Sequence, residues 1–269
     1  MAKEGVRGSL GRSRGTRRSP VWLLGDHDCS ASCFRTSPTD LHKPTKKTFT
    51  RRFILILLKL SHDDFVHFCG GSLLSERWVL TAGHCASPWQ GKLQVRRGSS
   101  RHACGGQVVT VKKVHRHPKY DAIAIDYDYS LLELEEAAIF TNSCSPVGLP
   151  QKDAPVKEGT CLQVSGWGNT QNPSESSDVL RAVHVPVVSQ EDCNEAYAEF
   201  HGVTDRMVCA GHMEGGKDNC QGDSGGPLVE GNTLVGVVSW GKGCAMVGYP
   251  GVYARVAAVR DWVTEVSGL

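Results

Sequence analysis

The sequence lacks an apolar run long enough to cross a membrane as a helix. Such a helix needs about 20 consecutive apolar residues, whereas the best candidate, residues 53–60, is eight residues long and is interrupted by Lys59. This run is better interpreted as a buried β-strand. We expect no secretory leader either, because the apolar stretch at 20–24 is too short for one. We therefore expect no membrane partner.

Acidic residues are scarce at the start of the chain. Residues 1–52 hold 12 Lys and Arg against 4 Asp and Glu, whereas residues 53–269 hold 18 against 24. A basic head could bind nucleic acid, but starts rich in Arg, Gly and Ser are more often solvated or removable. We expect residues 1–52 to be a separate basic segment, disordered or aberrant, and we expect no nucleic-acid partner.

The remaining sequence is typical of a turn-rich globular protein. At 269 residues, with 40% hydrophobic residues and 30 glycines, it can form one large domain or two packed subdomains. From Cys69 onward, short apolar runs alternate with Gly, Pro and Asn, which favours an all-β sandwich or barrel. The clearest runs are 78–80, 107–111, 162–165, 234–240 and 251–256. Only the tail has strong helical spacing, with Val256, Val259, Trp262, Val263 and Val266 at three- and four-residue steps.

The stretch KDNCQGDSGGP at 217–227 predicts a nucleophilic serine. A hydroxyl needs a base within hydrogen-bond reach and a third group that orients the base. The small residues around Ser224 allow a tight turn and close approach of a substrate carbonyl to the backbone. The main-chain N–H groups of Gly222 and Ser224 could then form an oxyanion hole.

His84 and Asp128 are the candidate partners of this serine. His84 lies in TAGHC at 81–85, directly after an apolar strand. Asp128 precedes the apolar run YSLLEL, which would bury its carboxylate and oblige it to find a partner. A core or surface histidine and a solvated loop acid are the competing interpretations, and the neighbouring Asp126 could take the place of Asp128.

The motifs TAGHC, DYSLLEL and GDSGGP, in the order His, Asp, Ser, resemble those of the trypsin-like serine peptidases of the chymotrypsin fold. The similarity covers about residues 65–267 and includes CGGSL at 69–73, SGWGNT at 165–170, VSWG at 238–241 and PGVYARV at 250–256. The amino-acid sequence at 120–134 and 203–254 is most similar to that of digestive trypsins of insects. The resemblance implies an all-β fold of two packed six-stranded antiparallel Greek-key barrels, about 53–150 and 151–253, with a C-terminal α-helix at 254–267. Together these would form one peptidase domain, 53–269.

The resemblance also implies an activity. It predicts a secreted, monomeric serine endopeptidase that cleaves dietary proteins or peptides after Arg or Lys through an acyl-enzyme and meets protein inhibitors. In this family the position of Asp218 holds the acid at the base of the specificity pocket, Gly241 and Gly251 line its walls, and Ser239 and Trp240 contact the substrate. The competing interpretation pairs Asp218 with Lys217 or Lys242.

The eleven cysteines favour an oxidising compartment. The resemblance implies the pairs Cys69–Cys85, Cys193–Cys209 and Cys220–Cys244. Five remain, namely Cys29, Cys33, Cys104, Cys144 and Cys161, so at least one thiol is free or intermolecular. His27, Cys29, Cys33 and His42 fit no common zinc spacing. Relatives often bind calcium after the catalytic histidine, but residues 85–120 contain no Asp or Glu. We expect no metal and no cofactor.

The activation segment of the family is not evident. In relatives a new Ile-Val-Gly-Gly-like terminus inserts beside the acid before the serine, here Asp223. No Ile or Val followed by paired glycines precedes Cys69, and the nearest substitute is Phe53 after Arg52. Either the first 52 residues are an aberrant segment, or the chain is a zymogen-like homologue that acts as a binding or regulatory module.

Overall fold

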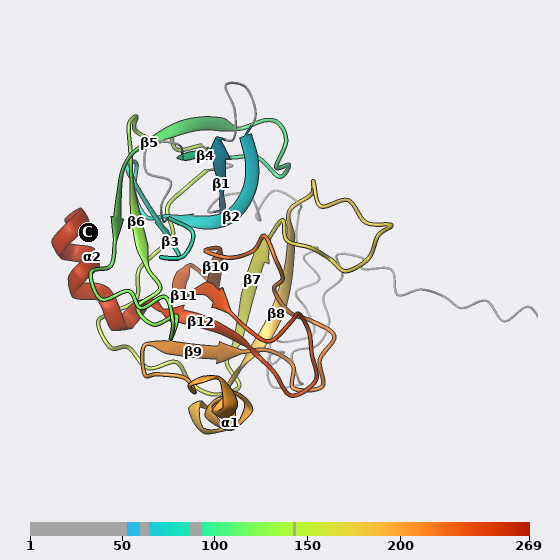
Figure 1. The fold of residues 1–269 in the computed structure, drawn as a ribbon. Coiled ribbons are helices and arrows are strands. Elements are labelled where there is room, and N and C mark those ends of the chain that lie inside the picture. Colours follow the sequence, from blue (N-terminus) through green and yellow to red (C-terminus); the bar gives the residue numbers. More distant parts are fainter. Residues whose placement is uncertain (1–52, 60–64, 87–92, 142–143) are drawn as a thin grey trace, which may run out of the picture.

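The computed structural model describes residues 53–59, 65–86, 93–141 and 144–269, which form two β-barrels and a C-terminal helix (Figure 1). The expectations for the basic head and for a zinc site at 27–42 lie outside the described residues. No helix in the described part of the chain has the length and apolar character needed to cross a membrane.

The first barrel contains six antiparallel strands in the closed order β1-β2-β3-β6-β5-β4. Their bounds are Phe53–Lys59 for β1, Phe65–Leu73 for β2, Trp78–Thr81 for β3, Leu93–Arg97 for β4, Gln107–Arg116 for β5 and Ser130–Leu134 for β6. In β4, Leu93, Val95 and Arg97 are buried while the two residues between them are half-buried. This period of two is the pattern of a strand with one face toward a core.

The second barrel repeats this arrangement with the order β10-β11-β12-β9-β8-β7. Its strands are β7 Cys161–Gly166, β8 Arg181–Val188, β9 Met207–Ala210, β10 Pro227–Glu230, β11 Thr233–Trp240 and β12 Gly251–Arg255. The all-β class and the two six-stranded antiparallel barrels predicted from the sequence are therefore confirmed. Each apolar run interpreted as a strand contributes to a strand of one of the barrels, and of the run 53–60 the described residues 53–59 form β1.

The C-terminal helix is confirmed, but its predicted start at residue 254 is wrong. Ala254 still belongs to β12, where it pairs with Met207 of β9 and Val237 of β11. A 3₁₀ turn, Val256–Val259, follows, and helix α2 covers only Arg260–Ser267. Sheet pairing thus overrides the helical spacing at the start of the segment. The helix packs Val263 into the core of the first barrel.

A short helix, α1, was not predicted. It covers Gln190–Ala196 and is followed by the 3₁₀ turn Ala198–Phe200. The Ser189 hydroxyl caps it by accepting from the Asp192 N–H, and a serine three residues before an acid is a recognised start signal. With only seven residues, its apolar spacing was too brief to stand out.

At Gly70 the main chains of the two barrels come into close contact. A methyl group added at Gly70 of β2 would lie 2.9 Å from the Gly226 Cα, just before β10. The Gly70 N–H also donates to the Ser224 carbonyl at 2.7 Å. This close approach positions the serine loop of the second barrel against the first.

Candidate active site

The structure brings His84 and Asp128 together. His84 lies in the turn after β3, and Asp128 lies two residues before β6, which is the neighbour of β3 in the sheet. The His84 Nδ1 atom lies 2.8 Å from Asp128 Oδ2, and the His84 main-chain N–H donates to Asp128 Oδ1 at 2.8 Å. The imidazole is 31% exposed whereas the carboxylate is 1% exposed. A buried acid therefore orients a ring whose other side can face a substrate.

A third donor to Asp128 comes from the second barrel. The Ser239 hydroxyl in β11 donates to Asp128 Oδ2 at 2.6 Å. Ser239 was expected to contact the substrate, yet its side chain is buried and directed at the acid. A buried carboxylate needs hydrogen-bond donors, and these bonds supply them.

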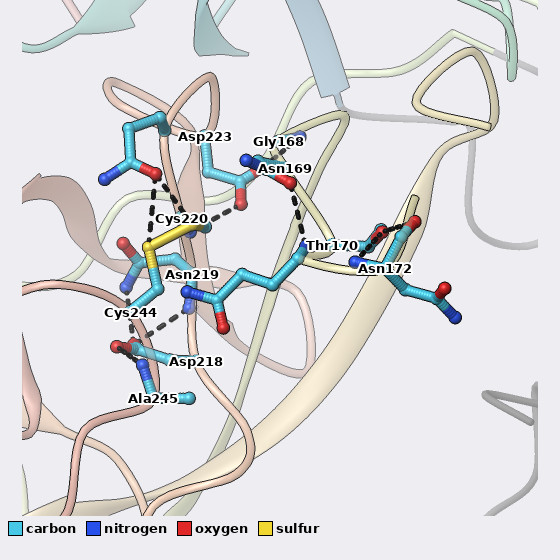
Figure 2. Close-up of a disulfide and its surroundings, with 12 residues drawn as sticks. Gly168, Asn169, Thr170, Asn172, Asp218, Asn219, Cys220, Asp223, Cys244 and Ala245 are labelled. Atoms are coloured by element: carbon cyan, nitrogen blue, oxygen red, sulfur yellow. Dashed lines mark hydrogen bonds between the residues drawn. A yellow bond between two sulfur atoms is a disulfide. The ribbon is translucent and has the colours of Figure 1, made fainter. Parts of the chain in front are cut away.

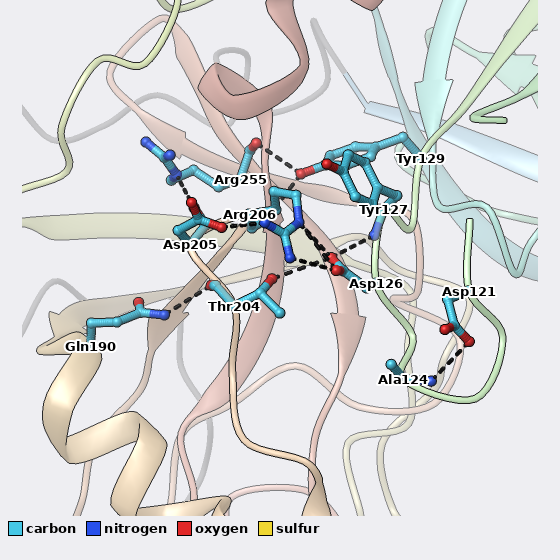
Figure 3. A network of polar contacts seen from close by, with 10 residues as sticks. All are labelled: Asp121, Ala124, Asp126, Tyr127, Tyr129, Gln190, Thr204, Asp205, Arg206 and Arg255. Atoms are coloured by element: carbon cyan, nitrogen blue, oxygen red, sulfur yellow. Dashed lines mark hydrogen bonds and ion pairs between the residues drawn. The ribbon is translucent and has the colours of Figure 1, made fainter. Parts of the chain in front are cut away.

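The rival acid, Asp126, is directed elsewhere. Its carboxylate accepts from the Arg206 guanidinium, with Nη2 2.7 Å from Oδ2, and from the Thr204 hydroxyl (Figure 3). Although desolvation acts against it, the Arg206 pair lowers the pKa of Asp126. The geometry therefore favours Asp128 as the partner of the imidazole.

Ser224 lies in a tight loop just before β10. Gly222 has φ 97°, a conformation that residues with a side chain rarely adopt. Gly225 has φ 78°, and a methyl group there would lie 3.2 Å from Ala82 N, two residues before His84. The glycines thus allow the serine loop to turn and to lie against the segment that carries the imidazole.

The buried carboxylate of Asp223 anchors this loop through hydrogen bonds. Its carboxylate accepts from the main-chain N–H groups of Gly168 at 2.8 Å and Cys220 at 2.9 Å (Figure 2). Burial raises the pKa of the Asp223 carboxyl, and these two bonds act in the opposite direction. A methyl group at Gly166 or Gly168 would overlap the carboxylate. These two glycines make room for the acid, a role that the sequence did not reveal.

Asp218 lies six residues before Ser224, beside the Cys220–Cys244 disulfide (Figure 2). Its Oδ1 accepts from the Asn219 N–H at 2.8 Å, and its Oδ2 accepts from the Ala245 N–H at 3.0 Å. Desolvation raises the pKa of Asp218 despite these donors. A methyl group at Gly251 would lie 3.0 Å from Asp218 Oδ1, so Gly251 adjoins the acid, as the resemblance implied.

Asn219 is a pocket residue that the sequence did not single out. Its side-chain Nδ2 donates to Asp218 Oδ1 at 3.1 Å and to the Tyr253 hydroxyl at 2.8 Å. The same Nδ2 atom would lie 2.7 Å from a methyl group at Gly251. Its amide therefore helps to hold the carboxylate in place.

Two adjoining concave spaces lie beside the residues that precede Ser224. A cavity of about 200 Å³ extends between Asp218 and Asp223 and is also lined by Gly168 and Ala245. An open groove adjoins this cavity and is lined by Gly222, His67, Phe68 and Trp167. Asp218 and Asp223 thus border the cavity, whereas Gly222 borders the groove.

Trp240 and Gly241 follow Ser239 at the end of β11. The Trp240 ring packs edge-on against Tyr197, with ring centroids 4.7 Å apart, and Gly241 is exposed. The Lys242 ammonium donates to the Tyr249 hydroxyl at 2.9 Å, whereas the bonds to Asp218 come from Asn219 and Ala245. The competing pairing of Asp218 with Lys242 is therefore not what the geometry favours.

Three disulfides match the implied pairs, namely Cys69–Cys85, Cys193–Cys209 and Cys220–Cys244. Cys161 is disulfide-bonded as well, while Cys104 and Cys144 are free thiols. Within the described ranges, one group has the spacing of metal ligands, Cys69, His84 and Cys85. Its two sulfurs are bonded to each other, so it is not a metal-binding set.

Comparisons with known proteins agree with the motifs. The Trypsin family model matches residues 50–263. The chain is 76% identical over 212 residues to "Trypsin 5G1" of Aedes aegypti, covering 79% of this chain and 80% of that protein. It is 46% identical over 194 residues to "Trypsin" of Simulium vittatum, covering 72% and 78%. It is 45% identical over 210 residues to "Trypsin-2" of Salmo salar, covering 77% and 88%.

Proposed function

The chain belongs to the trypsin family, as a trypsin-like serine endopeptidase that cleaves after basic residues, and from this premise we propose that His84, Asp128 and Ser224 form its catalytic triad. The observation that carries the proposal is the 2.8 Å contact between His84 Nδ1 and Asp128 Oδ2. A buried carboxylate at this distance holds the Nδ1–H tautomer, which leaves Nε2 free to accept a proton.

In the first half of the reaction, Ser224 Oγ attacks the carbonyl carbon of the scissile bond while His84 Nε2 takes the hydroxyl proton. Asp128 stabilises the resulting imidazolium. His84 then gives the proton to the leaving amine, and the acyl group stays on Ser224. In the second half, water attacks the acyl-enzyme, His84 again acts as base, and Ser224 is regenerated.

The main-chain N–H groups of Gly222 and Ser224 stabilise the oxyanion that forms during each attack. Such a donor contributes a factor of about 10² to 10³ in kcat when it is already in place before the reaction. The φ of 97° at Gly222 and the bonds from Gly168 and Cys220 to Asp223 support this arrangement, because they fix the two residues that precede Ser224.

Asp218 selects the substrate side chain. The carboxylate lies in a partly desolvated position, so an arginine or lysine head group from the substrate repays the unfavourable burial of its charge. Gly241 and Gly251 leave room for the substrate side chain, and Trp240 contacts the substrate.

Asp223 is the activation partner in this proposal. A positively charged chain terminus placed beside its carboxylate would stabilise the buried charge and fix the loop of Gly222. The three disulfides and the bonded Cys161 favour an oxidising compartment, so we include secretion in the proposal. We also include digestion of dietary protein, inhibition by protein inhibitors and a monomeric state.

The test is covalent labelling of the nucleophile. The natural protein is isolated, its N-terminus is sequenced, and the folded enzyme is treated with an organophosphate. Labelling at Ser224, with parallel loss of arginine-amide hydrolysis, is the expected result. Ser224→Ala should lower kcat by about 10⁶, whereas Ser267→Ala, on helix α2, should leave it unchanged. An unlabelled Ser224 in folded, processed enzyme would refute the triad.

A further inference from the structure

The loop that carries Asp128 has an unfavourable backbone conformation. Ile125 and Tyr127 have φ values of 51° and 50°, in the left-handed region that a residue with a Cβ rarely occupies. A β-branched isoleucine is especially unfavourable there. Such conformations persist only where the surroundings enforce them, so some other contact must hold this loop just before Asp128.

Besides the main-chain bonds between Asp121 and Asp126, a cross-barrel ion pair holds the loop. Asp126 belongs to the loop of the first barrel, and Arg206 directly precedes β9 of the second barrel. Arg206 Nη2 lies 2.7 Å from Asp126 Oδ2, and Arg206 Nε lies 3.1 Å from both carboxylate oxygens. The two side chains are 26% and 14% exposed. Several bonds from a planar guanidinium fix orientation as well as distance.

Further contacts extend this hold to the residues on both sides of Asp128. The Arg206 guanidinium lies 4.9 Å from the centre of the Tyr127 ring, and the His117 ring stacks on Tyr127 at 4.7 Å. The Tyr129 hydroxyl lies 3.0 Å from the Arg206 carbonyl oxygen and 2.9 Å from that of Arg255 (Figure 3). Asp128 is therefore flanked by residues anchored on the second barrel.

We propose that the Asp126–Arg206 ion pair is a positioning device for catalysis: it holds the loop in the strained conformation that directs Asp128 at His84. The pair itself touches neither the substrate nor the reacting atoms. This inference depends on the proposed triad. It assigns Asp126 a function distinct from that of Asp128, although the two acids are only two residues apart.

The experiment compares Arg206→Gln with a matched control. Arg101→Gln removes another arginine–aspartate pair between the barrels, with Arg101 Nη1 2.7 Å from Asp178 Oδ2, but that pair does not contact the loop of Asp128. In Arg206→Gln we expect kcat to fall about 10- to 100-fold with KM changed less than about threefold, which is the pattern of a lost transition-state interaction. Arg206→Lys should recover part of the loss, because it keeps the charge without the planar fork. Arg101→Gln should keep the kcat of the parent enzyme.

Two further measurements separate positioning from general stability. If Asp128 is misaligned, it stabilises the imidazolium less, so the acid limb of the kcat/KM profile should move to lower pH. The NMR resonance of the proton between His84 and Asp128 should broaden or shift in Arg206→Gln and stay unchanged in Arg101→Gln. A lower melting temperature with unchanged kcat, pH profile and resonance would refute the proposal.

A second variant covers the case in which Arg206→Gln does not fold. Asp126→Asn has nearly the same shape and loses only the charge, and it should show the same fall in kcat. Failure of the triad would be recognised separately, because Ser224→Ala would then retain activity. If Ser224→Ala is inactive while Asp126→Asn and Arg206→Lys both keep full kcat, only the positioning role is wrong.

Discussion

The hydroxyl of Ser239 lies 2.6 Å from Asp128 Oδ2, so a residue of the second barrel fixes the acid that the first barrel supplies. These positions are 111 residues apart in the sequence. The site is therefore assembled across the junction of the barrels, and its geometry depends on how the barrels pack together.

Ser239→Ala should slow the reaction without unfolding the enzyme. A hydrogen bond to a buried charge contributes about 1.5 to 3 kcal/mol, so we expect kcat/KM to fall about 10- to 100-fold on an arginine amide. Ser267→Ala, which removes a hydroxyl bonded within helix α2, is the control and should retain the parent rate. Equal rates for both variants would show that the Ser239 bond does not matter for catalysis.

Asp218→Ser should abolish the preference for basic side chains. Without the carboxylate, a buried substrate cation loses its partner at a cost of about 3 to 5 kcal/mol, so kcat/KM on arginine substrates should fall by about 10² to 10⁴. The comparison is made with matched arginine and phenylalanine amides, and Asp261→Ser, which removes an exposed acid on helix α2, serves as the control. A variant that still prefers arginine over phenylalanine would contradict the pocket assignment.

Gly168→Ala should disrupt the oxyanion hole indirectly, by displacing Asp223. The added methyl group would overlap the Asp223 carboxylate, displacing it and with it the turn at Gly222. We expect a fall in kcat of at least about 10² together with slower organophosphate labelling. Gly159→Ala is a suitable control, because its methyl group would meet no atom within 4 Å and its φ of 73° adds only local strain. A Gly168→Ala enzyme with normal kcat would show that Asp223 can move without harm.

His117 should make the folded protein sensitive to acid. Burial, with a smaller effect from Lys119, lowers the pKa of its imidazole to about 4 although Asp126 acts in the opposite direction, and the unfolded value is about 6.5. Because the folded pKa is the lower one, the stabilising contribution is complete above pH 6.5. It is lost as pH falls from 6.5 to about 4, where the unfolded chain binds the extra proton.

Urea unfolding at pH 7 and pH 5 can measure this contribution. In a Ser224→Ala background, which prevents self-digestion, the free energy of unfolding should fall by about 2 kcal/mol more for His117 than for His117→Phe. Phenylalanine keeps the stacking on Tyr127 and Trp262 but has no proton to bind. Identical losses in the two proteins would mean that other groups cause the acid sensitivity.

The sequence was informative wherever the signal was local. The strands and the motifs around His84, Asp128 and Ser224 each lie within a few consecutive residues. The three disulfides join cysteines 16 to 24 residues apart, and their pairing was implied by the family resemblance. The start of helix α2 was misjudged because pairing of Ala254 with β9 and β11 is a long-range contact that the spacing of apolar residues does not reveal.

Long-range contacts also explain why the sequence did not reveal some residues of the site. Asp126 and Asp128 have similar neighbours in the chain, and only the positions of Arg206 and His84 in space distinguish them. The amide of Asn219 and the glycines at 166 and 168 act through contacts with Asp218 and Asp223. Such roles depend on tertiary distances and have no spacing pattern that could predict them.

The contact between Gly70 and Gly226 has a consequence for how this enzyme can diverge. Because the two backbones approach closely there, a methyl group at Gly70 would overlap the main chain of Gly226. A side chain there would move the serine loop away from the first barrel, so the depth and angle of the nucleophile relative to its base depend on this glycine pair staying small.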